Sequence, residues 1–179
     1  FFINSAHTVP VISICGDNIL GLINDTDPNA FTEKFDGALE FFDRTGALQT
    51  EAMGTFDKHG NDSWAYAQRG LDFVTRDQYG YNYALKHKIF GNKSRKKFQR
   101  IILKAGASDN YPFEGQANNN YPGELGGTHL RDPYVHALSQ NGDLLLDERT
   151  YDACILYVNG QYWGLYESRE KVDDNDFTD

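Results

Sequence analysis

The sequence predicts an α+β fold with a mainly antiparallel sheet, hairpin connections and at least one helix. Two apolar runs flank Asn159-Gly160, a pair typical of a tight hairpin because both turn positions need positive φ. Short β-rich runs bounded by Gly, Asn and Asp recur along the chain. A segment near Asp132 has the pattern of a helix start. Together these features indicate hairpin-linked strands with few helices.

The hairpin near the end of the sequence is the clearest element. Cys154, Leu156 and Val158 alternate with Ile155 and Tyr157, as expected of a strand. We expect residues 153–158 to pair antiparallel with residues 161–166. A charged segment, residues 167–171, follows, and a chain that stops soon after its best strand pair looks cut short.

Other segments have weaker signals. The runs at residues 9–15, 38–42, 71–74 and 98–103 are rich in β-forming residues and predict strands, and residues 55–59 could form another. Residues 115–127, rich in Asn and Gly, predict a mobile surface loop. We expect Asp132 to cap a helix that begins at Pro133 and ends near Gly142, since proline suits the first helical position.

Composition bounds the function. A chain of 179 residues with 40% hydrophobic and 14% aromatic residues can bury a core, and this composition argues against an intrinsically disordered protein. The net charge of −9 argues against nucleic acid or an anionic membrane as partner of the whole chain, and no apolar run predicts a membrane span. Cys15 and Cys154 lie in strand-like runs and suit buried free thiols, although a disulfide is possible.

One segment is strongly basic. Eight of the 17 Lys and Arg residues lie between Lys86 and Lys104 without an acidic residue, so the rest of the chain carries −17 (−9 minus 8). Such a cluster can hold phosphates, and it is equally typical of a solvated strand edge whose lysines prevent aggregation. We favour the edge interpretation for residues 93–97. Arg100 and Lys104 are better phosphate candidates because the strand beside them would fix them.

Sequence motifs for metal or nucleotide sites are missing. The five histidines have no metal-ligand spacing, and residues 173–176 match a calcium loop only in composition, so no metal site is predicted. The sequence has no Walker loop and no dinucleotide fingerprint.

An ordered set of short runs resembles the spore-coat CotH kinase family, whose domain has an atypical protein-kinase fold. The set spans nearly the whole chain. It comprises Pro-Val-Ile-Ser-Ile at 10–14 with Asp-Asn at 17–18, Glu-Phe-Phe-Asp at 40–43, His-Gly-Asn-Asp-Ser at 59–63, Gln-Arg-Gly-Leu at 68–71, Leu-Lys-Ala-Gly at 103–106 with Asp109, Leu-Arg-Asp at 130–132, Val-Asn-Gly-Gln-Tyr-Trp-Gly-Leu-Tyr at 158–166 and Arg-Glu-Lys-Val-Asp at 169–173.

The resemblance implies the N-terminal lobe of a kinase-like fold that binds ATP with Mg²⁺ and phosphorylates protein. By matched position, Arg69 and Lys104 would contact phosphate, and Glu170, Lys171 and Val172 would form the linker against the adenine. The family also implies a secreted or cell-surface protein, with a protein substrate or surface partner and a larger multidomain parent.

Two departures from the family pattern stand out. Arg69 and Gly70 occupy positions where the family usually has Lys and Ser, and arginine is a planar fork, not a compact ammonium. The family's catalytic and metal-binding aspartates would lie beyond Asp179, so residues 1–179 would be a single or partial domain without activity of its own. The alternative is a non-catalytic secreted or surface module that binds through loop tyrosines such as Tyr81, Tyr83, Tyr111 and Tyr121.

Overall fold

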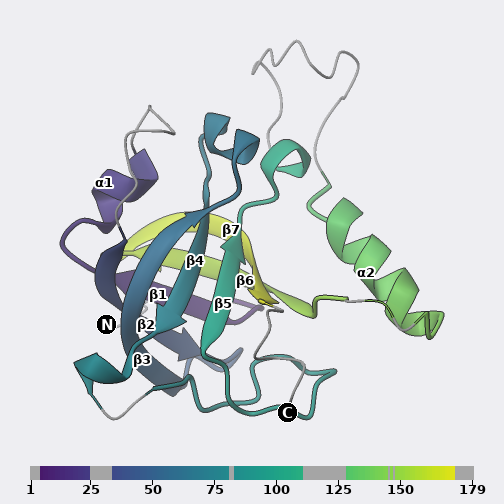
Figure 1. The fold of residues 1–179 in the computed structure, drawn as a ribbon, viewed down its shortest axis with the longest axis horizontal. Coiled ribbons are helices and arrows are strands. Elements are labelled where there is room, and N and C mark those ends of the chain that lie inside the picture. Colours follow the sequence, from purple (N-terminus) through teal and green to yellow (C-terminus); the bar gives the residue numbers. More distant parts are fainter. Residues whose placement is uncertain are drawn as a thin grey trace.

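The computed structural model describes residues 5–24, 34–80, 83–110, 128–144, 146 and 148–171. Within them the chain forms one closed barrel, with neighbouring strands in the order β1-β2-β3-β4-β5-β7-β6 (Figure 1). The strands are β1 (Val11–Cys15), β2 (Phe35–Phe42), β3 (Leu48–His59), β4 (Gly70–Thr75), β5 (Arg100–Lys104), β6 (Tyr151–Val158) and β7 (Gln161–Glu170). The helices are α1 (Ile19–Asn24) and α2 (Arg131–Asn141), with short 3-10 turns η1 (Asp62–Ala65), η2 (Asp77–Tyr79) and η3 (Ala107–Asp109).

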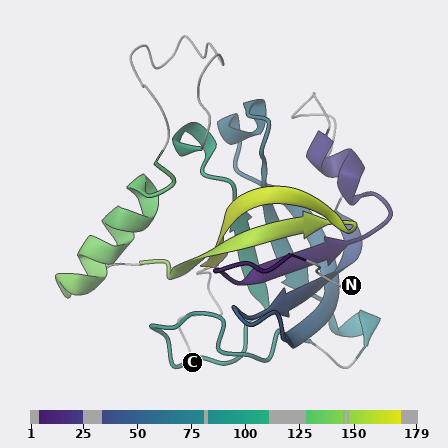
Figure 2. The ribbon, with the colours of Figure 1, turned by 180° about the vertical axis from the view of Figure 1, so that it is seen from behind.

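The predicted α+β class is therefore wrong. The structure is a closed mixed barrel, mostly sheet, with two short helices, and not an α+β lobe of the kinase type. The antiparallel hairpins were predicted, but the closing contact is the parallel pairing of β1 with β6, in which Val11 lies opposite Ile155 and Ile14 opposite Val158 (Figure 2). These partners are 144 residues apart, and local hydrophobic periodicity carries no information about such a pairing.

The β6–β7 hairpin confirms the strongest sequence prediction. Val158 pairs with Gln161 across the turn, where Asn159 has φ 49° and Gly160 has φ 79°. The turn also closes the barrel. The Asn159 amide side chain accepts from the Gly16 N–H at 3.0 Å and donates to the Gly16 carbonyl at 3.1 Å, and the Asn159 N–H donates to the Ile14 carbonyl at 2.8 Å.

The barrel interior is the hydrophobic core. Phe56 and Phe73 lie on paired strands β3 and β4, with ring centroids 4.7 Å apart. Close packing leaves no room at Gly54, where an added Cβ would lie 2.2 Å from the Val74 carbonyl oxygen. Cys154 is buried in this core, and burial raises the pKa of its thiol. Cys154 and the half-buried Cys15 are both free, which is one of the two alternatives that the sequence left open.

Helix α2 stands beside the barrel (Figure 1), and its residue Asp132 contacts Lys104 at the end of β5 and Arg169 on β7. Its start differs from the prediction: the helix begins at Arg131, and Asp132 lies inside the first turn without capping it. The cap comes from Asp109 of η3, whose carboxylate accepts from the backbone N–H of Arg131 at 2.9 Å and of Thr128 at 2.8 Å. The predicted loop at 115–127 lies outside the described residues.

Candidate functional site

A chain of charged side chains joins β5, α2 and β7. Lys104, the last residue of β5, donates to the carboxylate of Asp132 in the first turn of α2. The same carboxylate oxygen accepts from Nη1 of Arg169 at 2.6 Å, and Arg169 Nε donates to Glu167 at 2.9 Å. Because Arg169 and Glu167 are buried on β7, Asp132 fixes the position of Lys104 against a rigid part of the barrel.

Burial and charge act in opposite directions on the two carboxylates. Burial would raise the pKa of Asp132, but the hydrogen bond from Lys104 and the charge of Arg169 lower it to about 2. For Glu167, burial raises the pKa, and the Arg169 guanidinium offsets only part of that effect. Asp132 is therefore a firmly ionised partner for both cations.

A cavity of about 240 Å³ lies next to the Lys104 side chain, which forms part of its wall. We call it the Lys104 cavity. Five of its eight lining residues are glycine, alanine or serine, so small side chains make up much of the wall. Its lining residues are His59, Gly60, Ser63, Gln68, Gly70, Lys104, Ala105 and Ala107.

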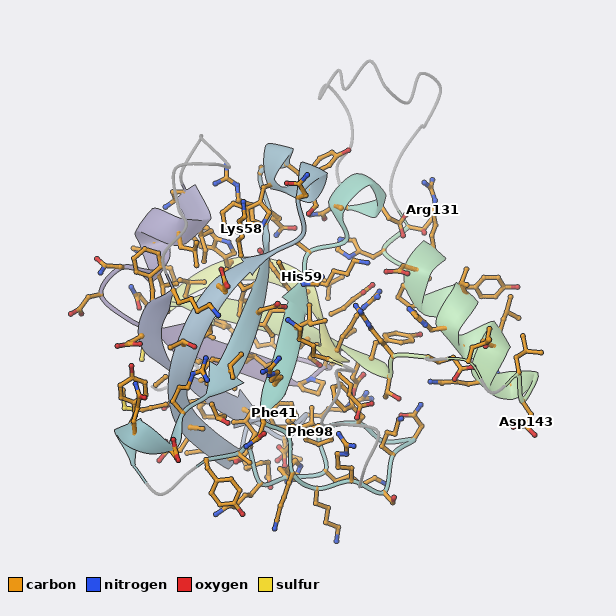
Figure 3. The ribbon with its side chains drawn as sticks, in the orientation of Figure 1. Phe41, Lys58, His59, Phe98, Arg131 and Asp143 are labelled. Atoms are coloured by element: carbon orange, nitrogen blue, oxygen red, sulfur yellow. The ribbon has the colours of Figure 1, made fainter. Side chains whose placement is uncertain are left out.

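A second ion-pair group lies on the strands beside this cavity. The Asp72 carboxylate contacts Nδ1 of His59 at 2.9 Å and Nζ of Lys171 at 2.5 Å. Burial would raise the pKa of Asp72, but the hydrogen bonds from these two partners lower it. His59, at the end of β3, therefore has a fixed orientation in the cavity wall; it lies toward the end of the barrel away from Phe41 and Phe98 (Figure 3).

The two residues expected to contact phosphate lie in different surroundings. Lys104 lines the cavity, and its side chain is 25% exposed. Arg69 is buried beside the start of β4: its guanidinium lies 5.1 Å from the centroid of the Trp64 ring, and its carbonyl accepts from the Tyr166 hydroxyl at 3.0 Å. The side chain of Arg69 therefore packs against a core aromatic ring, while its neighbours Gln68 and Gly70 line the cavity.

The expected linker residues begin inside a strand. Glu170 is the last residue of β7 and is buried, with Lys93 at 3.3 Å and Arg95 at 3.1 Å from its carboxylate oxygens. Lys171 bonds to Asp72, and Val172 lies outside the described residues. Glu170 pairs with Ile101, three residues along β5 from Lys104, so it does not share the Lys104 cavity.

Sequence reasoning missed three residues of the site. Asp132 was interpreted as a helix cap, and Arg169 and Glu167 as part of a charged exit segment. The signal was present in the alternation of Glu167, Arg169 and Lys171 after a strand, which places all three on one face. The contact between this face of β7 and α2 depends on the closure of the barrel, so the spacing of residues in the sequence could not predict it.

Other features of the molecule give weaker evidence for a functional site than the Lys104 cavity. A cavity of about 260 Å³ elsewhere is lined in part by Glu51, Met53 and Arg76, so its charged side chains include both signs. Among the residues described, no three His, Cys, Asp or Glu side chains are grouped so as to hold a metal ion. No helix in this part of the chain is long and apolar enough to span a membrane.

Searches of family models and of curated proteins identify no relative of this chain. No model of a known family matches the sequence, and a search of curated proteins finds no match. The resemblance to the CotH family therefore stays a prediction, and the site has to be judged by its own chemistry.

Proposed function

We propose that the Lys104 cavity binds the phosphate groups of a nucleotide, with ATP as the first candidate, and that the chain is the nucleotide-binding part of a CotH-like protein kinase. The observation that carries this proposal is the position of Lys104, which lines the cavity and whose ammonium is anchored by Asp132. Protein kinases use this chemistry: a strand lysine, held by a helix carboxylate, positions the phosphates. The proposal rests on the site and needs no kinase-like fold.

The ammonium has donors to spare for a ligand. A lysine carries three N–H donors, and Lys104 uses one of them on Asp132 within the described structure. Arg169 also holds Asp132, so a phosphate that draws Lys104 away would not leave the carboxylate alone. The remaining N–H donors of Lys104 can thus reach a ligand at small cost in reorganisation.

The size of the cavity suits phosphate better than a whole nucleotide. Its volume of about 240 Å³ falls below the roughly 300–1,000 Å³ of pockets that enclose drug-sized ligands. The phosphates would lie inside, near Ser63 and the backbone at Gly60 and Gly70, and the base would lie outside. We expect modest affinity, since only the phosphate end gains buried contacts.

The described residues form no recognisable site for Mg²⁺. Mg²⁺ would neutralise phosphate charge when bound, but the described part of the chain groups no three carboxylate or imidazole ligands. We therefore assign no step to the metal. The protein acceptor and a secreted or surface location belong to the same proposal through the resemblance alone.

The proposal is tested by calorimetric titration of the chain with ATP. We expect binding in the range of about 0.1–1 mM, and Lys104→Met should weaken it at least about tenfold by removing a charge-assisted hydrogen bond. Lys97→Met is the matched control, since Lys97 is an exposed lysine away from the cavity, and it should change the affinity less than about twofold.

Two further ligands separate the possible outcomes. Tripolyphosphate should bind about as well as ATP if the phosphate chain supplies the contacts, and adenosine should not bind. A titration without heat at millimolar ATP, or equal loss in both lysine variants, would contradict the proposal. The alternative hypothesis, a non-catalytic binding module, would then account better for the barrel.

A further inference from the structure

The basic segment forms a built surface of the barrel. Residues 84–99, which we call the basic loop, form the last part of the connection from β4 to β5 and lie at the end of the barrel where β5 begins, whereas Lys104 is the last residue of β5 (Figure 1). A pair of backbone hydrogen bonds of 2.9 and 3.0 Å joins Leu85 to Phe98. Phe90 and Phe98 are buried and meet edge to face, with centroids 5.2 Å apart. The loop is therefore anchored from below by its apolar side chains.

The charges of this loop are left largely uncompensated. Lys93 and Arg95 both contact the carboxylate of Glu170. Four other lysines are exposed and make no ion pair with any carboxylate in the described structure; they are Lys86, Lys88, Lys96 and Lys97. No acidic residue occurs between Asp77 and Asp109. A patch of one sign thus lies on an otherwise acidic protein.

The closed barrel removes the simplest structural reason for these lysines. Lysine is common on exposed strand edges, where it prevents edge-to-edge pairing. Here β5, the strand that follows the loop, pairs with β4 on one side and with β7 on the other. A closed barrel has no free edge to protect, so the lysines need another explanation.

We infer that the basic loop is a docking surface for an acidic segment of a partner protein. Electrostatic attraction acts over about 8 Å at physiological salt, so a short acidic segment on the loop would feel the lysines more than the distant acidic surface. A partner of this kind gains its specificity and its association rate from charge complementarity.

Two other anionic partners fit the loop less well. Single-stranded nucleic acid needs exposed aromatic rings for stacking, yet Phe90 and Phe98 are buried, and the ring of Tyr83 at the loop border has the Lys86 ammonium 5.0 Å from its centroid. Binding to an anionic membrane usually needs an exposed apolar side chain beside the lysines. Ile89, the apolar residue that follows Lys88, is buried and cannot serve as this anchor. A large polyanion would also meet the charge of −15 (−9 minus 6) carried by the chain outside the basic loop.

The test is fluorescence anisotropy with a short labelled peptide of alternating Glu and Gly, beside a matched peptide of alternating Gln and Gly. We expect binding of the acidic peptide that weakens with salt, and no binding of the Gln peptide. Changing Lys86, Lys88, Lys96 and Lys97 together to Gln should weaken binding at least about tenfold. The variant should melt like the wild type, because all four side chains are exposed.

A control variant separates the loop from net charge. The control changes four basic residues outside the loop to Gln, namely Lys34, Arg44, Lys58 and Arg149, and so removes the same number of positive charges. It should change the affinity for the acidic peptide by less than about twofold. Equal weakening in both variants, or no binding at low salt, would overturn the inference. Tighter binding of duplex DNA or of phosphatidylserine vesicles would also overturn it. Lys104 is untouched in every variant, so failure here is distinct from failure of ATP binding.

Discussion

The Asp132 carboxylate lies 2.6 Å from Nη1 of Arg169, and this contact ties helix α2 to the barrel. Arg169 is buried on β7 with only 2% of its side chain exposed, whereas Asp132 is 44% exposed. The helix is thus held by a buried cation that reaches a half-exposed carboxylate. Loss of the carboxylate would leave Arg169 with Glu167 as its acidic partner among these residues.

Replacement of Asp132 by asparagine should destabilise the fold through this contact. We expect Asp132→Asn to lower the free energy of unfolding by about 1–2 kcal/mol, less than for a fully buried pair because water screens the carboxylate. Asp143→Asn, at the other end of the helix region (Figure 3), should change it by less than about 0.5 kcal/mol. Urea unfolding measures both, and equal effects would show that the contact with Arg169 contributes little.

The same contact predicts a dependence on pH. The pKa of Asp132 is about 2 in the folded protein and about 3.9 when unfolded. A lowered pKa stabilises the fold above the unfolded value, and this stabilisation is lost as pH falls from about 4 to 2. The stability difference between wild type and Asp132→Asn should therefore be full at pH 5 and vanish near pH 2. A difference that stays constant across this range would contradict the assignment.

Local structure was largely predictable from the sequence. The Asn159-Gly160 turn, the alternation around Leu156 and the runs at β1, β2, β4 and β5 carry their own periodicity and turn chemistry. Helix α2 was found, but its start was misplaced because the capping carboxylate, Asp109, belongs to a different segment. A cap supplied from another element leaves no mark in the helix sequence.

The long-range arrangement was not predictable. Closure depends on the parallel pairing of β1 with β6, and the charged network depends on α2 meeting β7. Of the expected site residues, Lys104 was placed in a cavity wall, and Arg69 beside a buried Trp64. The sequence shows that a positively charged residue, Arg69, precedes β4, but its burial against the Trp64 ring depends on tertiary packing.

The closing turn gives a test of the fold. Asn159→Ala removes both side-chain hydrogen bonds to Gly16 and places alanine at φ 49°, so we expect a loss of about 2–3 kcal/mol in unfolding free energy. Asn159→Gly removes the same hydrogen bonds without backbone strain and should cost about 1 kcal/mol less. Thermal or urea unfolding measures both. A loss below about 0.5 kcal/mol in the alanine variant would mean that the turn does not stabilise the closure.

The most direct test of the account is a map of backbone amide shifts by nuclear magnetic resonance during titration with ATP. If Lys104 and its cavity hold the phosphates, the shifts should concentrate at Gly60, Ser63, Gly70, Ala105 and Ala107 and should disappear in Lys104→Met. Shifts confined to the basic loop, residues 84–99, would instead show attraction of ATP to surface lysines, and would contradict the assignment of the Lys104 cavity as a nucleotide site.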